Sequence, residues 1–183
     1  MPVTLNATVG GANSNTYLIL SDAQAIVDSL MPTEETTNWD SATTDTKNRA
    51  LVTATWRLDR ERFFGNRTSN TQALQWPRTG VRKPDQYQPS YQAGYLFSLR
   101  QDYYDDDEIP DEIKKAATIL ALYLVTEPEA LSLGGLEQFK SVTVGPLSVT
   151  PMQPQDQRLL PPLVNQYLRG LKASPQNISI YRN

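Results

Sequence analysis

The sequence contains neither cysteine nor histidine. Without cysteine the chain has no disulfide framework, no thiolate nucleophile and no zinc site built on thiolates. Without histidine it has no Ser-His relay, no HExxH metal site and no imidazole for acid and base catalysis. Because the usual catalytic and metal-binding groups are missing, we expect a protein that is not an enzyme and that holds no cofactor and no metal ion.

The sequence also lacks long apolar runs and has no basic residue near its beginning. The longest largely apolar run covers the ten positions from Ala116 to Val125, whereas a bilayer-spanning helix needs about 20 residues. The first basic residue is Lys47, so the beginning of the chain lacks the positive region of a secretory signal. We therefore expect no membrane partner, and we interpret the apolar run as a buried helix.

Spacing of the apolar residues predicts four helices. Ser21-Asp22-Ala23-Gln24 has the pattern of a capping box at the start of the first helix. Gly65 is expected to end the second helix, and Pro110 suits the first turn of the third. The expected helices cover about residues 21–30, 44–62, 110–127 and 161–172. In the second helix the predicted inward side chains are Leu51, Ala54, Thr55 and Leu58. In the third they are Ile113, Ala116, Ala117, Leu120, Ala121 and Leu124, and in the fourth they are Leu163, Val164, Tyr167, Leu168 and Leu171.

Polar and apolar residues alternate on both sides of Gly145-Pro146, which is typical of a two-stranded hairpin at about residues 139–150. The predicted fold is therefore mainly α, a small bundle of about four helices with one β-hairpin. Residues 1–172 form the body, which includes a long inserted loop at about residues 82–108. Residues 173–183 form an extended C-terminal tail.

The inserted loop is rich in tyrosine. Six aromatic residues within an 18-residue stretch are hard to bury in one subunit, and tyrosine is enriched at protein interfaces. We interpret this loop as a docking surface, and we expect the tail to add a strand to a partner. The predicted interface residues of the loop and the tail are Tyr87, Tyr91, Tyr95, Tyr103, Tyr104, Ile178, Ile180 and Tyr181.

Basic and acidic residues are unevenly distributed, although the net charge is only −3. Residues 47–83 hold nine basic residues against two acids, which leaves −10 for the remainder of the chain. Such separation favours self-association or a position beside nucleic acid. We expect Arg57, Arg60 and Arg62 to face DNA or a neighbouring subunit. The alternative is a solvated helix face whose arginines pair with acids.

The three tryptophans admit two interpretations. Beside arginines they suit a stacking platform for single-stranded nucleic acid, but tryptophans more often anchor a core. We interpret Trp56 as a core residue because it lies within a predicted helix, and we leave Trp39 and Trp76 open. The acidic run Asp105-Asp106-Asp107-Glu108 lacks the alternation and glycine turn of a calcium loop, so we interpret it as a solvated loop.

Several separated motifs follow one another over about residues 10 to 150. They are Gly11-Ala12-Asn13-Ser14-Asn15-Thr16-Tyr17-Leu18, Ser21-Asp22-Ala23, Ala50-Leu51-Val52-Thr53-Ala54-Thr55, residues 73–81, Ile109-Pro110 and residues 142–149. In this order they resemble the successive signatures of tailed-phage head-tail adaptors, and Leu74-Gln75-Trp76-Pro77-Arg78 is the most specific of them. Related sequences also carry the label of a DnaT-like single-stranded DNA-binding protein.

This resemblance implies a structural subunit that forms a ring, typically of twelve copies, between the portal protein and the tail or nozzle protein. Double-stranded DNA would pass through the ring without sequence-specific contacts, and the protein would reside at the head-tail interface of the virion. The alternative function is that of a DnaT-like single-stranded DNA-binding replication protein. Trp76, Pro77 and Arg78 are predicted to lock one subunit to its neighbour, or alternatively to close the subunit's own core.

Overall fold

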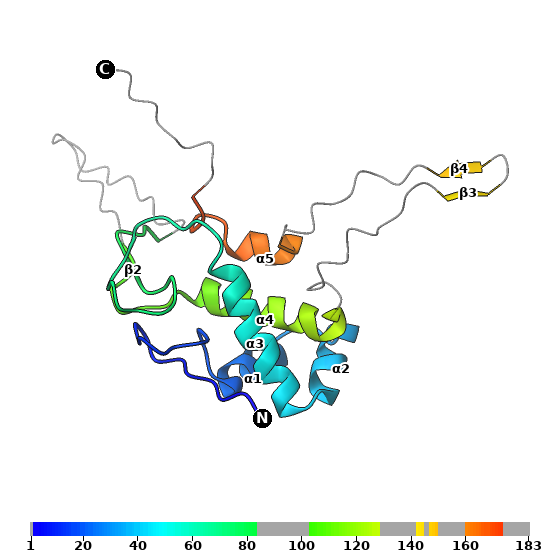
Figure 1. Cartoon of the computed structure of the whole chain (residues 1–183), viewed down its shortest axis with the longest axis horizontal. Coiled ribbons are helices and arrows are strands. Elements are labelled where there is room, and N and C mark those ends of the chain that lie inside the picture. Colours follow the sequence, from blue (N-terminus) through cyan, green and yellow to red (C-terminus); the bar gives the residue numbers. More distant parts are fainter. Residues whose placement is uncertain (1, 84–102, 129–141, 145–146, 150–159, 174–183) are drawn as a thin grey trace, which may run out of the picture.

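The computed structural model describes residues 2–83, 103–128, 142–144, 147–149 and 160–173 (Figure 1). Within these residues the chain forms five helices and two small antiparallel sheets of two strands each. The prediction of a mainly α fold with a β-hairpin is confirmed. The elements are α1 (Leu20–Asp28), α2 (Glu34–Ser41), α3 (Thr44–Leu58), β1 (Asn66–Arg67), β2 (Arg78–Thr79), α4 (Asp111–Thr126), β3 (Val142–Val144), β4 (Leu147–Val149) and α5 (Pro162–Tyr167).

Helix α4 lies at the centre of the bundle and contacts α1, α2, α3 and α5 (Figure 1). Its predicted apolar stripe is confirmed, since all six residues of that stripe are buried. Pro110 is the N-cap residue and precedes the first turn, where Asp111 and Glu112 favour the positive end of the helix. The helix ends at Thr126, before Pro128 as expected.

Helix α3 packs against α4 through the predicted face, and Leu51, Ala54, Thr55 and Leu58 are fully buried. The helix ends at Leu58, one turn earlier than the sequence predicts, and the C-cap residue is Asp59, whose carboxyl bonds Tyr17 and Gln75. Gly65 is therefore not the terminator. It lies beside β2 with a φ of +69°, where an added Cβ would come within 2.2 Å of the Thr79 carbonyl oxygen.

The capping box predicted for α1 is wrong. The N-cap residue is Ile19, and no side chain caps the helix. Gln24 instead joins α1 to α2, because its Oε1 accepts a hydrogen bond from the Trp39 indole at 2.9 Å and its Nε2 donates to Asp40 at 3.1 Å. The side-chain amide of Gln24 therefore joins two helices and does not cap the start of α1.

Helix α2 was not predicted, and it carries a capping box of its own. The Thr36 hydroxyl accepts from the Thr33 backbone N–H at 2.8 Å, and the Thr33 hydroxyl accepts from the Thr36 N–H at 3.4 Å. A hydrogen bond with Thr33 lowers the pKa of the exposed Glu35 carboxyl. Trp39, which is completely buried, anchors the helix in the core and resolves the open question about this residue.

Helix α5 begins at Pro162, as the sequence predicts, and ends at Tyr167 rather than at Lys172. Val164, Leu168 and Leu171 are fully buried, and Tyr167 packs against the core from a partly buried position. The prediction for Leu163 is wrong, since 48% of this residue is exposed. The hairpin of β3 and β4 pairs Val142 with Val149 and Val144 with Leu147.

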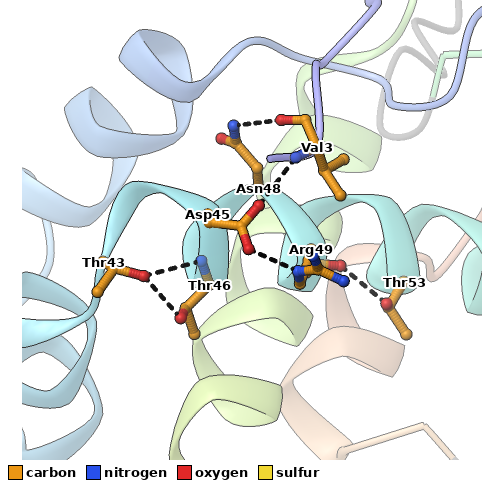
Figure 2. A network of polar contacts seen from close by, with 7 residues as sticks. All are labelled: Val3, Thr43, Asp45, Thr46, Asn48, Arg49 and Thr53. Carbon is orange, nitrogen blue, oxygen red and sulfur yellow. Dashed lines mark hydrogen bonds and ion pairs between the residues drawn. The ribbon is translucent and has the colours of Figure 1, made fainter. Parts of the chain in front are cut away.

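The start of the described body is fastened to α3, and its end is fastened to the turn after this helix. Near its start, the Val3 N–H donates to Asp45 Oδ1 at 2.8 Å and Asn48 Nδ2 donates to the Val3 carbonyl at 2.8 Å (Figure 2). Arg49 donates to the same carboxylate at 2.7 Å, and this bond, followed by that from Val3, lowers the pKa of Asp45. At the end of the described body, the Ala173 N–H donates to the carbonyl of Arg62, four residues after α3, at 2.8 Å.

Candidate nucleic-acid interface

The Leu-Gln-Trp-Pro-Arg element lies inside the subunit. Trp76 is 1% exposed and meets Phe63 and Tyr104 edge-to-face, with ring centroids 5.6 and 6.4 Å away. Pro77, joined to Trp76 by a cis peptide bond, is buried too. This placement supports the alternative in which the element closes the subunit's own core. A contact with another subunit through these residues stays a prediction.

Arg78 is 8% exposed and binds main-chain carbonyl groups. Its Nε donates to the Phe64 carbonyl at 2.7 Å, and Nη2 donates to the Gly65 carbonyl at 2.6 Å and to that of Phe63 at 3.4 Å. Nη1 donates to both the carbonyl and the side-chain oxygen of Gln75. Burial lowers the pKa of the guanidinium. Arg78 thus holds the turn after α3 in shape, a role that a surface arginine does not have.

Tyr17 and Asp59 form a second buried polar contact. The Tyr17 hydroxyl donates to Asp59 Oδ1, and the Gln75 N–H donates to Oδ2 at 3.3 Å. Burial raises the pKa of Asp59 despite these bonds. Burial, together with the nearby Asp59 charge, also raises the pKa of Tyr17. The pair ties the segment before α1 to the end of α3.

This contact predicts a pH-dependent loss of stability in Tyr17→Phe. Because the pKa of Asp59 is raised in the folded state, wild-type stability falls as pH rises from the unfolded to the folded pKa of this carboxyl. Loss of the hydroxyl affects the carboxylate more than the neutral acid. We expect a loss of about 1–2 kcal/mol at pH 7 and a smaller loss at pH 4, measured by urea unfolding.

The exposed Tyr123 supplies a control for this prediction, because Tyr123→Phe removes a hydroxyl from the surface of α4. The free energy of unfolding of Tyr123→Phe should differ little from that of the wild type, and by the same amount at pH 4 and at pH 7. A Tyr17→Phe variant that loses the same free energy at pH 4 and pH 7 would contradict the proposed link to Asp59.

The tyrosines predicted to dock a partner differ in their exposure and contacts. Tyr104 is 8% exposed and packs against Trp76, so its assignment to a docking surface is not supported. Its hydroxyl donates to Glu112 Oε2 at 3.2 Å, and burial is the main cause of its raised pKa. Tyr103 is 45% exposed and forms a backbone bridge with Arg82. The remaining predicted docking residues, Tyr87, Tyr91, Tyr95, Ile178, Ile180 and Tyr181, lie outside the described residues.

The acidic run borders a hollow of about 520 Å³ between the segment before α1 and the start of α4. Asp105, Asp107 and Glu108 line it together with Asp22 and Lys114. Glu108 also lies 3.9 Å from the Lys83 ammonium group. Within the described residues, no three carboxylates are grouped so that they could hold a metal ion.

The predicted basic residues gather at the end of α3, and we call Arg57, Arg60 and Arg62 the basic end. Arg60 and Arg62 are exposed, whereas Arg57 is half-buried and makes contacts of its own. The acid between the two exposed arginines, Glu61, is bound by Lys172 at 2.6 Å. The other acid of this stretch, Asp59, is occupied by Tyr17 and Gln75.

Two cationic side chains therefore remain uncompensated. In the part of the chain that the structure describes, neither Arg60 nor Arg62 forms an ion pair or a side-chain hydrogen bond. Of the alternative interpretation, the solvent exposure of these two side chains is therefore observed, whereas their pairing with acids is not seen among the described residues. An exposed positive charge without a counter-charge attracts phosphate.

Trp56 lies on the same helix and corrects a prediction. The sequence predicts a core position for Trp56, yet 60% of this residue is exposed. The signal was present in the register, because Leu51, Ala54, Thr55 and Leu58 define the buried face and position 56 falls opposite to it. The two tryptophans that the sequence left open are the buried ones.

The described helices include none that is long and apolar enough to cross a membrane. Fold and surface together define a small, mainly helical protein with an exposed indole on α3 and, in the turn after this helix, two exposed arginines that form no ion pair among the described residues. Aromatic faces and cations are the groups with which proteins bind single-stranded nucleic acid. The chain belongs to the family described as "Putative DnaT-like ssDNA binding protein", whose model matches residues 1–183. No curated protein and no solved structure matches the chain. The comparisons thus agree with the second label of the resemblance and give no support to the head-tail adaptor label.

Proposed function

We propose that this protein binds single-stranded DNA through the basic end of α3, without sequence specificity and without catalysing a reaction. The family match over the whole chain is the observation that carries this proposal. The geometry supports it, because Arg60 and Arg62 present charges that no acid of the described chain neutralises. Guanidinium groups in such positions follow the phosphate backbone and make binding sensitive to salt.

Removal of one exposed arginine should weaken binding. We expect Arg60→Gln and Arg62→Gln each to lower affinity for a dT20 oligonucleotide several-fold in about 50 mM salt. Each should also reduce the slope of log K against log salt by about 0.7, since one phosphate contact is lost. Fluorescence anisotropy of a labelled oligonucleotide measures both quantities.

Lys115→Gln is the matched control, because Lys115 is an exposed cation on α4, outside the basic end. It removes the same unit of charge and should leave affinity within about twofold and the salt slope unchanged. Equal effects of Lys115→Gln and Arg60→Gln would show that only net charge matters. A wild-type protein that binds no oligonucleotide in low salt would overturn the proposed function.

A second candidate function is that of a head-tail adaptor of a tailed phage. The favouring observation is the mainly α fold with its hairpin, which is the architecture that the resemblance over residues 10–150 implies. In this function the protein would form a ring, with twelve copies as the expected number, and reside in the virion between portal and tail. The basic end would then face the double-stranded DNA in the channel or a neighbouring subunit.

The two candidate functions predict assemblies of different mass and different binding partners. Multi-angle light scattering with and without portal protein distinguishes a portal-bound ring from a species that assembles only on single-stranded DNA. A ring at the portal vertex, together with weak and salt-insensitive binding of dT20, would support the adaptor. A chain that stays monomeric with portal protein would exclude it.

A further inference from the structure

We infer that Trp56 is a base-stacking residue that places a nucleobase of single-stranded DNA on the exposed face of α3, between Arg49 and Arg60. This inference rests on the proposed single-stranded DNA binding and adds to it a contact with the bases. The basic end alone provides only contacts with phosphates.

Exposure separates Trp56 from the other two tryptophans. Trp39 and Trp76 are 0% and 1% exposed, whereas Trp56 is 60% exposed. Tryptophan is highly buried on average, so an exposed fraction of 60% is unusual for this residue type. Neither ring stacking nor a cation over the ring involves Trp56 in the described structure. Its indole is thus available to a planar ligand.

Helical spacing places Trp56 in line with two arginines. Arg49, Thr53, Trp56 and Arg60 follow one another at steps of four, three and four residues, which keeps them on one helix face. Arg60 lies two residues beyond α3, but its N–H bonds to the Arg57 carbonyl at 3.4 Å and so extends the last turn. The indole is therefore flanked by an arginine position on either side along the helix axis.

The two flanking arginines differ in their charge environment. Arg49 pairs with Asp45 (Figure 2) at 2.7 Å, although 56% of the Arg49 side chain is exposed. Thr53 lies between Arg49 and Trp56, and its short side chain donates to the Arg49 carbonyl at 2.8 Å. Arg60 has no such partner among the described residues. The strand's phosphates should therefore contact the Arg60 side of the indole most strongly.

Stacking on an indole selects single strands over duplexes. Bases of a single strand present free π-faces, whereas those of a duplex already stack on one another. Removal of one stacking aromatic typically weakens binding by about fivefold to a hundredfold, without removing a phosphate contact. Affinity and salt slope should thus respond differently to Trp56 and to Arg60.

The test compares Trp56→Ala with Trp56→Phe in the full chain. We expect Trp56→Ala to weaken binding of dT20 by about tenfold with an unchanged salt slope, and Trp56→Phe to stay within about threefold of wild type. Weak binding of a 20-base-pair duplex should not change in either variant. Circular dichroism and thermal melting of Trp56→Ala check that the exposed substitution leaves the fold intact.

Tryptophan fluorescence gives an independent readout. Addition of dT20 to the wild type should quench the exposed indole and protect it from acrylamide, and both responses should vanish in Trp56→Phe, which keeps the two buried tryptophans. If dT20 binds with a salt slope that depends on Arg60 but Trp56→Ala binds equally well and no quenching occurs, the inference is wrong and the proposed function stands. If no oligonucleotide binds at all, both fail.

Another copy of this chain is the competing occupant of the exposed indole. In that case the emission of Trp56 would shift with protein concentration in the absence of DNA, and Trp56→Ala would lower the mass measured by light scattering. This outcome would overturn the inference and would favour an assembly contact.

Discussion

Replacement of Trp76 by alanine is expected to lower the free energy of unfolding by about 3–5 kcal/mol. The indole is enclosed in the core, and it holds Phe63 and Tyr104 by edge-to-face contacts. Alanine would leave a cavity between the turn after α3 and the segment before α4, and these segments cannot collapse fully to fill it. Urea unfolding followed by far-UV circular dichroism measures the change.

Trp56→Ala supplies a control of the same chemistry at an exposed position. We expect it to change the free energy of unfolding by less than about 1 kcal/mol. The comparison also bears on the ring contact that the sequence suggests for Trp76. If Trp76→Ala keeps full stability as an isolated subunit and loses only assembly, then the core role that we assign to Trp76 is wrong.

The second large effect is expected for Arg78→Lys, a change that keeps the positive charge. The guanidinium donates to carbonyl groups of Phe63, Phe64 and Gly65 and to Gln75 from a buried position. A lysine ammonium carries its three donors on a single nitrogen atom. It cannot donate at once to carbonyl groups that lie around the planar guanidinium of Arg78. We expect a loss of about 2–4 kcal/mol, because the buried Phe63 carbonyl and the partly buried carbonyls of Phe64 and Gly65 lose a charged donor.

Arg62→Lys is the matched control, since Arg62 is exposed and its side chain bonds no carbonyl among the described residues. Its unfolding free energy should stay within about 0.5 kcal/mol of wild type. Both variants are compared by urea unfolding at the same pH and salt concentration. Equal, small losses in Arg78→Lys and Arg62→Lys would show that the carbonyl contacts of Arg78 contribute little to stability.

The helices that could be predicted are those with repeated apolar residues. In α3 and α4 four and six apolar or small residues recur at the helical period, and every one of them is buried. Helix α2 has a single large apolar side chain, Trp39, so its pattern contains no stripe. Its stability comes from the Thr33 and Thr36 caps and from the burial of that one indole, which only the tertiary structure reveals.

The candidate interface could be predicted in part, for physical reasons that differ between its residues. Charge density alone pointed to Arg60 and Arg62, and the structure leaves both exposed. The environment of Arg78 depends on carbonyl groups more than ten residues earlier in the chain, and a local motif does not encode that approach. Trp56 could have been placed on the surface, because the buried positions of α3 already fix which face points outward.

The attachment of the two ends of the described body has a mechanical consequence. Val3 is held by Asp45 and Asn48 at the start of α3, and Ala173 is held by the Arg62 carbonyl in the turn after this helix. Between these two attachments lies a helix about 20 Å long. A donor and acceptor dye pair at positions 3 and 173 would therefore report on the separation between the start of α3 and the turn that follows it.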